Sequence, residues 1–585
     1  MAAIISEKFR IFNAKQFLES LGEGVNDADT DRTRMYFFVG RSSRWDAYLE
    51  IFNVNGTFQV GETVSGGGWS GVVAAVYPNS LLLTTILPTP TTTPAFGTSI
   101  GGGTSSATAK SGVYRYGTED APPAPLDNAS EKQSIFDEMI AAKRITSAFA
   151  RLVVPRYNWN LSLNPKFDMY RPSYAPTPGG GGAIGKQTAL GATSLSASKF
   201  YVMNSRYEVF KCLYNGEYDS DTGANATYEP TSQPVAGQGT FANGIFTEPA
   251  GTAGYIWKHM YTLTTGDVLA FLSSDFMPIA AVGEASRVAV ETAAIDGSID
   301  VAVVKDNGTA LPLSATLYTP VYGDGSGAIV KLTTNGAGEV TAAEMEAVGS
   351  GYTYGKVILE TGKVFTDPAL TAAAGAFGGT AAIEAVISPK GGHGSNAENE
   401  LFAKRVMTSV RLTYDEGQGD FPVDNDFRRI GIIQDPFVYG SGSFASDSTL
   451  RGTRVLKING ASADYVADEV ISQTVGSNIS YGTVVSWDSA NGILKYFQTP
   501  SLHAHNGVVR PFVSNNTDAV VGASSTASGT IASTENGTVS DITFTGGLAN
   551  PELEPNSGEV VYIENRRQIT RAPDQIEDIK LVIEF

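Results

Sequence analysis

Cysteine and histidine are scarce in this sequence. Cys212 is the single cysteine among 585 residues, which excludes an internal disulfide framework. The four histidines, His259, His393, His503 and His505, leave little material for a zinc centre or a histidine general base. No HExxH motif and no Cys/His metal signature occurs, so the sequence predicts neither metalloprotease chemistry nor a bound cofactor. We therefore expect a protein that is not an enzyme.

Clusters of positive charge and long apolar runs are also missing. The formal net charge is −19 and no Lys/Arg cluster stands out, which argues against a nucleic-acid surface or an anionic-membrane surface. No apolar run approaches the roughly 18 to 20 residues of a membrane-spanning helix. The first residues, MAAIISEKFRIF, lack the apolar core of a signal peptide. We expect a soluble protein made in a reducing cytoplasm, with protein partners and without membrane insertion.

The abundant residues are those of strands and turns. The chain contains 64 glycines and 27 prolines, many Thr, Ser and Val residues, and only 17% charged residues. This composition favours short strands and turns over helical bundles. The length also exceeds the roughly 250 to 300 residues at which a single core stops growing. The predicted fold class is mainly β with a few short helices, as a multi-domain β-sandwich-like core with inserted small β modules.

Three short segments have helical signals. Residues 13–22, NAKQFLESLG, offer Asn13 as an N-cap and a glycine as a stop. Residues 130–146, SEKQSIFDEMIAAKRIT, offer Ser130 as an N-cap before an apolar stripe, and they form the best helix candidate. Residues 264–276 are a third, weaker candidate. The rest of the chain carries little helical periodicity.

Aromatic and β-branched residues dominate four runs that we expect to be strands. The runs are RMYFFVG (34–40), KFYVMNSRYEVFKCLY (199–214), GYIWKHMYTL (254–263) and DIKLVIEF (578–585).

Three stretches richer in Gly, Ser, Thr and Ala resemble inserted modules: residues 52–112, 285–392 and 455–535. The first and third share a faint pattern. Residues 58–76 and 465–487 each contain an aromatic, an acidic residue, a β-branched pair, and then Ser, Gly and a strand. Each is followed by a second pair of similar segments, 97–109 in the first module and 518–532 in the third. The pattern predicts small β-hairpin or barrel modules.

Residues 176–190, PTPGGGGAIGKQTAL, nearly spell a phosphate-binding loop. Gln187 stands where a Ser or Thr would coordinate magnesium, and the lead-in contains three prolines. Proline removes backbone donors and rarely lies inside a buried strand. We interpret this stretch as a flexible Gly-rich connector and not as a nucleotide site.

Three acidic clusters and one histidine pair are candidate metal-binding or catalytic sites. The clusters at 27–31 and 219–225 match the first positions of a calcium loop but lack its turn glycine and its final glutamate, and a third lies at 415–426. His503 and His505 have a spacing compatible with a metal on one strand face, but no Cys or carboxylate is close. We expect solvated loop acids and ordinary histidines. Distant carboxylates that hydrolyse glycosides cannot be recognised by sequence spacing, so that chemistry stays open.

Outside the three modules, the sequence resembles a known family: the baseplate wedge proteins encoded by gene eight of T4-like contractile-tailed phages. The similarity covers about half of the chain in eight pieces, in the order of the family. These are SEKFRIFNAKQFLESLG, YFFVGRSSRWD (36–46), FDEMIAAKRIT (136–146), VVPRYNW (153–159), YVMNSRYEVFKCL (201–213), GYIWKHMYTL, DFPVDNDFRRIGIIQDP (420–436) and SGEVVYIENRRQITRAPDQIEDIKLVIEF (557–585).

The resemblance implies a structural virion protein without catalysis. It implies a wedge subunit that forms a homodimer within each wedge, contacts other baseplate wedge proteins around the tail tip, and is assembled in the host cytoplasm. Tail fibres and neighbouring baseplate subunits are further candidate partners, for the modules. The alternative is a receptor- or glycan-binding tail-tip protein. Its weakness is that glycan sites usually present aromatic platforms, whereas the modules contain only two tryptophans, Trp69 and Trp487.

The family-like segments form a discontinuous core, and the three modules are insertions in it. The core parts are 1–51, 113–284, 393–454 and 536–585, and the inserted β modules are 52–112, 285–392 and 455–535.

The family-like segments also supply the candidate contact residues, because Tyr, Trp and Arg tend to dominate interface energetics. Arg41 binds either a neighbouring subunit's carboxylate or Asp46 of its own loop, and the sequence leaves both open. The three tryptophans among the candidates are more readily explained as core anchors. The full set is Arg41, Trp45, Arg156, Trp159, Tyr255, Trp257, Arg428, Glu564, Asn565 and Arg566.

Overall fold

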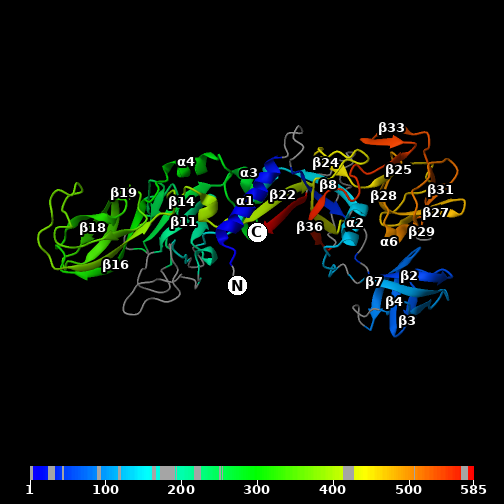
Figure 1. The fold of residues 1–585 in the computed structure, drawn as a ribbon, viewed down its shortest axis with the longest axis horizontal. Coiled ribbons are helices and arrows are strands. Elements are labelled where there is room, and N and C mark those ends of the chain that lie inside the picture. Colours follow the sequence, from blue (N-terminus) through cyan, green and yellow to red (C-terminus); the bar gives the residue numbers. More distant parts are fainter. Residues whose placement is uncertain are drawn as a thin grey trace. The chain divides into compact units, whose positions relative to one another are not determined.

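The protein was analysed as a computed structural model in which strands far outnumber helices (Figure 1). It describes residues 4–23, 33–41, 45, 47–88, 94–115, 117, 120–160, 166–170, 192, 194–215, 225–249, 252, 254–412, 427–505, 508–567 and 577–585. Several separate sheets and a closed barrel confirm the predicted multi-domain, mainly β fold class. The phosphate-loop-like stretch, two of the acidic clusters and all but the last residue of 219–225 lie outside the described residues.

The chain forms two compact units. Unit 1 comprises Met1–Glu19, Phe149–Ser409 and Lys580–Phe585. Unit 2 comprises Ser20–Ala148 and Val410–Ile579.

The helices are short, and their bounds differ from those predicted in all three cases. The structure has α1 (Glu7–Glu23), α2 (Ala129–Asp137), α3 (Thr265–Phe271), α4 (Ala285–Ala293), α5 (Ala397–Glu400), α6 (Pro500–His503) and the 3-10 turns Ser147–Phe149 and Leu195–Ala197.

Helix α1 begins at Glu7, so Asn13 lies inside the helix and is not its N-cap. The Phe9 N–H donates to the Ser6 carbonyl at 3.0 Å, and Ile11 and Ala14 are buried. The apolar contacts therefore extend the helix toward the N-terminus.

Helix α2 is capped by Asn128, whose side chain accepts from the Glu131 N–H at 2.8 Å, and not by Ser130. The helix stops at Asp137, and Met139–Ile145 is a strand. Pairing with two neighbouring strands overrides the helical periodicity there. The third prediction, 264–276, is confirmed in its first half. Helix α3 starts after Thr264, whose side chain accepts from the Asp267 N–H at 3.1 Å, but it ends at Phe271, and Phe276 begins a strand.

The central sheet of unit 2 has five strands in the order β24-β8-β1-β23-β36. Its strands are β1 (Met35–Gly40), β8 (Met139–Ile145), β23 (Arg429–Gln434), β24 (Thr449–Arg451) and β36 (Glu559–Asn565). Strand β1 is buried along its whole length, with Tyr36 and Phe38 inside a cluster that includes Ile433. Four sequence-distant segments therefore meet in one sheet.

Unit 1 contains two further sheets of the core. One has the order β10-β11-β14-β13-β12 and the other β15-β9-β22-β37. Their strands are β9 (Ala150–Pro155), β10 (Tyr201–Met203), β11 (Glu208–Asn215), β12 (Thr240–Ala242), β13 (Ile245–Thr247), β14 (Tyr255–Thr262), β15 (Phe276–Pro278), β22 (Arg405–Leu412) and β37 (Glu577–Glu584). The four runs predicted as strands are confirmed by β1, the β10–β11 hairpin, β14 and β37.

The middle module lies in unit 1. A long two-stranded ribbon, β16 (Ile299–Thr309) with β21 (Thr380–Ile387), stands beside a four-stranded sheet in the order β19-β18-β17-β20. The sheet consists of β17 (Thr316–Gly323), β18 (Ser326–Thr334), β19 (Val340–Ser350) and β20 (Gly355–Val357). Leu317, Val330 and Leu332 form the centre of its core.

The first module contains a closed six-stranded barrel in the order β2-β5-β4-β3-β6-β7 (Figure 1, blue). The strands are β2 (Ala47–Asn55), β3 (Thr63–Gly66), β4 (Trp69–Tyr77), β5 (Ser80–Leu87), β6 (Ser99–Gly102) and β7 (Thr108–Arg115). Leu49, Val64, Trp69 and Leu81 fill the interior. The barrel therefore extends a few residues beyond the predicted range 52–112.

The third module repeats this barrel. Strands β28-β27-β26-β31-β32-β25 are hydrogen-bonded in that order, and an additional β25–β28 pairing closes the ring. The strands are β25 (Arg454–Asn459), β26 (Val470–Val475), β27 (Asn478–Asp488), β28 (Ile493–Phe497), β31 (Ala519–Gly522) and β32 (Ser528–Ile531). An extension follows, β33 (Asn536–Val539), β34 (Ile542–Thr545) and β35 (Leu548–Ala549), and the small ribbon β29 (Ala504–His505) with β30 (Val508–Val509) completes this part of unit 2.

The two barrels share their strand register. Ile51 pairs with Ser111 in the first barrel as Ile458 pairs with Ile531 in the second. The same bulge interrupts β4 and β27, at Val73/Ala75 and at Val484/Ser486. We name them barrel 1 (residues 47–115) and barrel 2 (454–531). That they are modules inserted into a core remains a prediction.

In each barrel, a buried glutamate accepts hydrogen bonds from a loop in the same way. In barrel 1, Glu62 accepts from the Ser105 hydroxyl at 2.7 Å and from the N–H groups of Gln59 and Thr104. Burial opposes ionisation, but these hydrogen bonds from Ser105, Gln59 and Thr104 lower the pKa of Glu62 to about 2. A Cβ on Gly102 would lie 2.5 Å from the Glu62 carboxylate, which explains the glycine.

Barrel 2 repeats the arrangement with different residues. Glu469 accepts from the Ser525 hydroxyl at 2.7 Å and from the N–H groups of Val466 and Ser524. A Cβ on Gly522 would lie 2.6 Å from this carboxylate. The sequence pattern shared by the two modules therefore corresponds to the same local structure in both: an ionised glutamate that accepts hydrogen bonds from the N–H and hydroxyl groups of a tight loop.

Candidate interaction sites

Six of the predicted contact residues converge at the end of the central sheet of unit 2. Arg41 follows β1 in a left-handed conformation (φ 58°), and its Nη1 donates to Glu138 at 3.0 Å. Its guanidinium lies over the Trp45 ring, 4.1 Å from the centroid. Glu138 is therefore an internal partner of Arg41, whereas Asp46, one of the two alternatives left open by the sequence, lies outside the described residues.

Trp45 is the centre of this cluster. It is 4% exposed, and its Nε1–H donates to the Arg566 carbonyl at 2.7 Å. The Arg429 guanidinium also lies 5.5 Å from the ring centroid. Two cations against one buried indole make Trp45 an anchor of the sheet end.

The neighbouring arginines and asparagine tie β23 to β36 and to the preceding loop. Arg428 is 1% exposed, and its carbonyl accepts from the Arg566 N–H at 2.7 Å. Arg429 Nε donates to Asn565 Oδ1 at 2.9 Å, and Arg429 also pairs with Glu131. Asn565 donates onward to the Pro123 carbonyl at 2.8 Å. These residues therefore make their hydrogen bonds and ion pairs to other groups of the same chain.

Glu564 and Arg566 remain the accessible members of this cluster. Their side chains are 38% and 30% exposed, and they form an ion pair at 3.4 Å. Glu564 also accepts from the Tyr562 hydroxyl at 2.9 Å. Because such exposed pairs contribute little stability, both side chains are available for another protein at low cost.

The remaining candidates lie in unit 1. Tyr255 and Trp257 are completely buried on β14, stacked at 5.4 Å, and Trp257 meets Phe167 edge-on at 5.0 Å. They are core anchors of their sheet and cannot be surface contacts in this fold. Trp159 is partly buried and stacks on Phe167 at 6.0 Å.

Arg156 holds a loop edge of unit 1. Its Nη1 donates to the Ser273 carbonyl at 2.6 Å, and its Nε donates to Asn158 at 2.8 Å. Its role in the described chain is to connect β9 to the turn before β15.

A buried charged cluster in unit 1 was missed by sequence reasoning. Lys211 is fully buried on β11, forms an ion pair with Glu400, and lies 2.7 Å from His393 Nδ1. Its ammonium lies over the Tyr170 ring at 4.8 Å. Glu400 also accepts from the Gly394 N–H at 2.8 Å. No sequence motif could reveal residues so far apart in the chain.

Burial dominates the protonation of this cluster. It lowers the pKa of Lys211, which Glu400 partly restores, and it lowers the pKa of His393 well below its usual range, together with the nearby charges of Lys211 and Lys258. His393 is therefore neutral, with Nδ1 accepting from the Lys211 ammonium. The cluster connects β11 to the loop before α5, and we interpret its role as structural.

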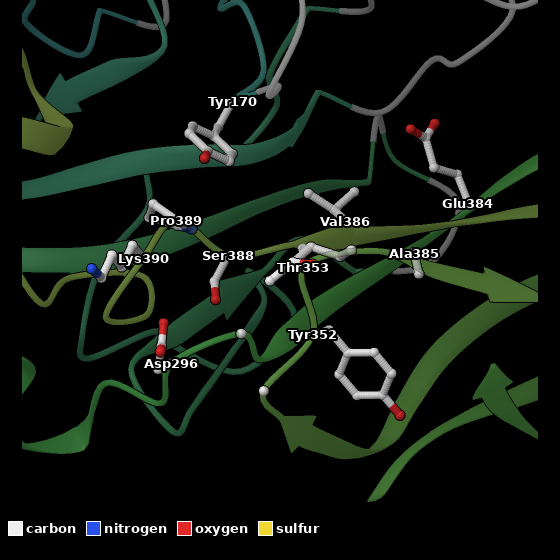
Figure 2. Close-up of a pocket in the computed structure, with 13 residues that line it drawn as sticks. Tyr170, Asp296, Tyr352, Thr353, Glu384, Ala385, Val386, Ser388, Pro389 and Lys390 are labelled. Carbon is white, nitrogen blue, oxygen red and sulfur yellow. The ribbon is translucent and has the colours of Figure 1, made fainter. Parts of the chain in front are cut away.

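A pocket of about 520 Å³ lies beside this cluster, at the end of the β16–β21 ribbon. Figure 2 shows Tyr170, Ser388, Asp296 and Lys390 among its lining residues. Ser388 is 8% exposed, and its hydroxyl has no hydrogen-bond partner among the described residues. An unsatisfied buried hydroxyl at a pocket wall can accept or donate to a polar ligand.

Three features of the sequence that bear on metal or catalytic chemistry can be compared with the described residues. Within them, no cluster of three or more His, Cys, Asp or Glu side chains could hold a metal. Residues 97–101 match the GxSxG pattern, but Ser99 begins a barrel strand and accepts from Lys110 Nζ at 2.7 Å. A nucleophile elbow instead needs a strand-to-helix turn and a histidine. His503 is fully buried at the end of α6, where its Nε2 meets the Thr483 hydroxyl at 2.9 Å.

In the part of the chain that the structure describes, no helix is both long and apolar enough to cross a membrane. No protein-family model and no curated protein sequence matches this chain.

Proposed function

We propose that this protein is a structural wedge subunit of a contractile-tail baseplate, which assembles with other wedge proteins around the tail tip. The distributed resemblance to the gene-eight family of T4-like phages supports this role. The multi-sheet β architecture and the accessible Glu564–Arg566 pair agree with it. The structural observation that carries it is a second apolar face on helix α1.

Helix α1 has apolar residues on two sides. Ile11 and Ala14 are buried against the chain. Ile5, Phe9 and Phe12, just before and within the helix, are 61%, 53% and 56% exposed. Their spacing places them on one stripe of the helix. A stripe of large apolar side chains facing water is typical of a surface that another subunit covers.

The test is reconstitution of the purified full chain with its co-encoded tail proteins, followed by light scattering. We expect a homodimer that joins wedge proteins in a fixed ratio. Phe9→Ser with Phe12→Ser should abolish or weaken this assembly by roughly tenfold or more, because buried aromatic anchors dominate interfaces. Val282→Ser is the matched control, since Val282 is 81% exposed in the same unit but lies off the stripe. A wild-type chain that ignores every tail protein would contradict the proposal.

A second candidate is glycan binding at the tail tip, which the pocket beside Ser388 favours. The two module tryptophans do not support it, because Trp69 is 2% exposed inside barrel 1 and Trp487 packs on Tyr465. Ligand-observed NMR with host polysaccharide fragments would test this function. Binding that disappears in Asp296→Asn and Ser388→Val would establish it, and the absence of any saturation transfer would exclude it.

A further inference from the structure

Barrel 1 exposes an aromatic pair on its outer surface. Phe52 on β2 and Phe96 before β6 have ring centroids 5.4 Å apart at an interplanar angle of 28°. Phe52 is 37% exposed and Phe96 is 75% exposed. The interior of the barrel is filled by other residues, such as Leu49 and Ile51, so the pair is not part of the core.

Barrel 2 shows that the fold does not need this pair. Phe52 pairs with Lys110 across β2 and β7, and the matching register in barrel 2 pairs Asn459 with Thr530. Phe96 lies three residues before Ser99, the first residue of β6, and Asn516 lies three residues before Ala519, the first residue of β31. Both phenylalanines of barrel 1 therefore correspond to asparagines in barrel 2.

The charge beside the pair is also particular to barrel 1. Lys110 Nζ donates to the Ser99 hydroxyl at 2.7 Å, and within the described residues Lys110 forms no ion pair. The corresponding residue of barrel 2 is the uncharged Thr530. In the described part of barrel 1, an exposed aromatic surface therefore lies beside an ammonium that bonds to a hydroxyl and to no carboxylate.

We propose that Phe52, Phe96 and Lys110 form a docking surface for another protein of the tail, one that presents an apolar side chain flanked by a carboxylate. The apolar side chain covers the aromatic pair, and the carboxylate pairs with Lys110. Exposed apolar surface that the fold does not require marks an interaction site. This inference rests on the proposed function and names a partner chemistry for it.

The test uses the full chain and its co-encoded tail proteins in the reconstitution described above. Phe52→Asn with Phe96→Asn gives barrel 1 the residues of barrel 2, so the variant should keep the wild-type melting temperature. It should bind the tail protein that contacts barrel 1 roughly tenfold or more weakly. Asn459→Ser with Asn516→Ser is the matched control in barrel 2 and should leave binding unchanged.

Lys110 provides a second variant that leaves the aromatic pair intact. Lys110→Glu should weaken binding by roughly threefold to tenfold and Lys110→Arg should preserve it, because a rim charge acts through complementarity. Equal binding by wild type and the asparagine variant would overturn this inference while leaving the proposed function intact. Self-association through the pair, or saccharide binding to it, would also overturn it. If the wild-type chain binds no tail protein, the proposed function itself fails.

Discussion

The Ser105 hydroxyl donates a hydrogen bond to the Glu62 carboxylate at 2.7 Å, which connects the loop after β6 to the residue before β3. We expect Glu62→Gln to destabilise barrel 1 by about 1 to 3 kcal/mol, because an amide cannot accept from all the buried donors that face the carboxylate. Glu469→Gln should do the same in barrel 2. Hydrogen exchange, read strand by strand, should show faster exchange only in the substituted barrel.

The control for this pair of variants is Glu559→Gln, an exposed acid on β36, which should change stability by less than about 0.5 kcal/mol. Exchange that accelerates equally in both barrels would refute the independence of the two glutamate contacts.

Acid should destabilise the protein partly through His503. Burial lowers the pKa of His503 from 6.5 to about 3. As the pH falls below 6.5, the unfolded chain binds a proton that the folded chain does not. Stability is therefore fully present above pH 6.5 and is lost by about 1.4 kcal/mol per pH unit on the way down to pH 3. Urea denaturation between pH 7 and 5 would measure this slope.

His503→Gln isolates this contribution, since glutamine keeps a polar group for Thr483 and Thr499 but does not titrate. The variant should have a flatter dependence of stability on pH than the wild type. Parallel curves for the two proteins would show that His503 does not contribute.

The buried pair of Lys211 and Glu400 should be strongly coupled. Lys211→Met leaves the Glu400 charge buried without its ion-pair partner, and we expect a loss of about 3 to 5 kcal/mol. The double variant with Glu400→Gln should lose less than the sum of the two single variants. The exposed pair of Lys331 and Glu344, whose side chains are 34% and 64% exposed, is the control and should show coupling below about 1 kcal/mol. Additive losses at Lys211 and Glu400 would contradict the assignment.

Trp45 should contribute to stability through its hydrogen bond to the Arg566 carbonyl and its contacts with the Arg41 and Arg429 guanidinium groups. Trp45→Phe removes the donor to the Arg566 carbonyl and weakens the contacts with the Arg41 and Arg429 guanidinium groups. We expect a loss of about 1 to 3 kcal/mol in the free energy of unfolding, measured by guanidinium titration. Trp487→Phe, which removes a bond to Asp464 at an exposed site, should cost less. A larger effect of Trp487→Phe would reverse this ranking.

Local signals in the sequence determined several elements directly. The aromatic and β-branched runs at 34–40 and 254–263 became β1 and β14, and the helical signal that starts at 264 became α3. In each case short-range propensity and the surrounding fold favour the same conformation. The composition likewise determined the mainly β class, because glycine, threonine and valine favour turns and strands at every point of the chain.

Tertiary structure decided the features that depend on distant segments. Residues 139–145 have helical periodicity but form β8, because pairing with β1 and β24 satisfies their backbone and buries both faces. The faint likeness of 58–76 to 465–487 gave no register, and only the closed strands show that Glu62 and Glu469 occupy one position. Lys211 and Glu400 are 189 residues apart and meet only in the folded chain. Sequence periodicity reports which residues prefer burial, whereas the partner of a buried charge is chosen by packing.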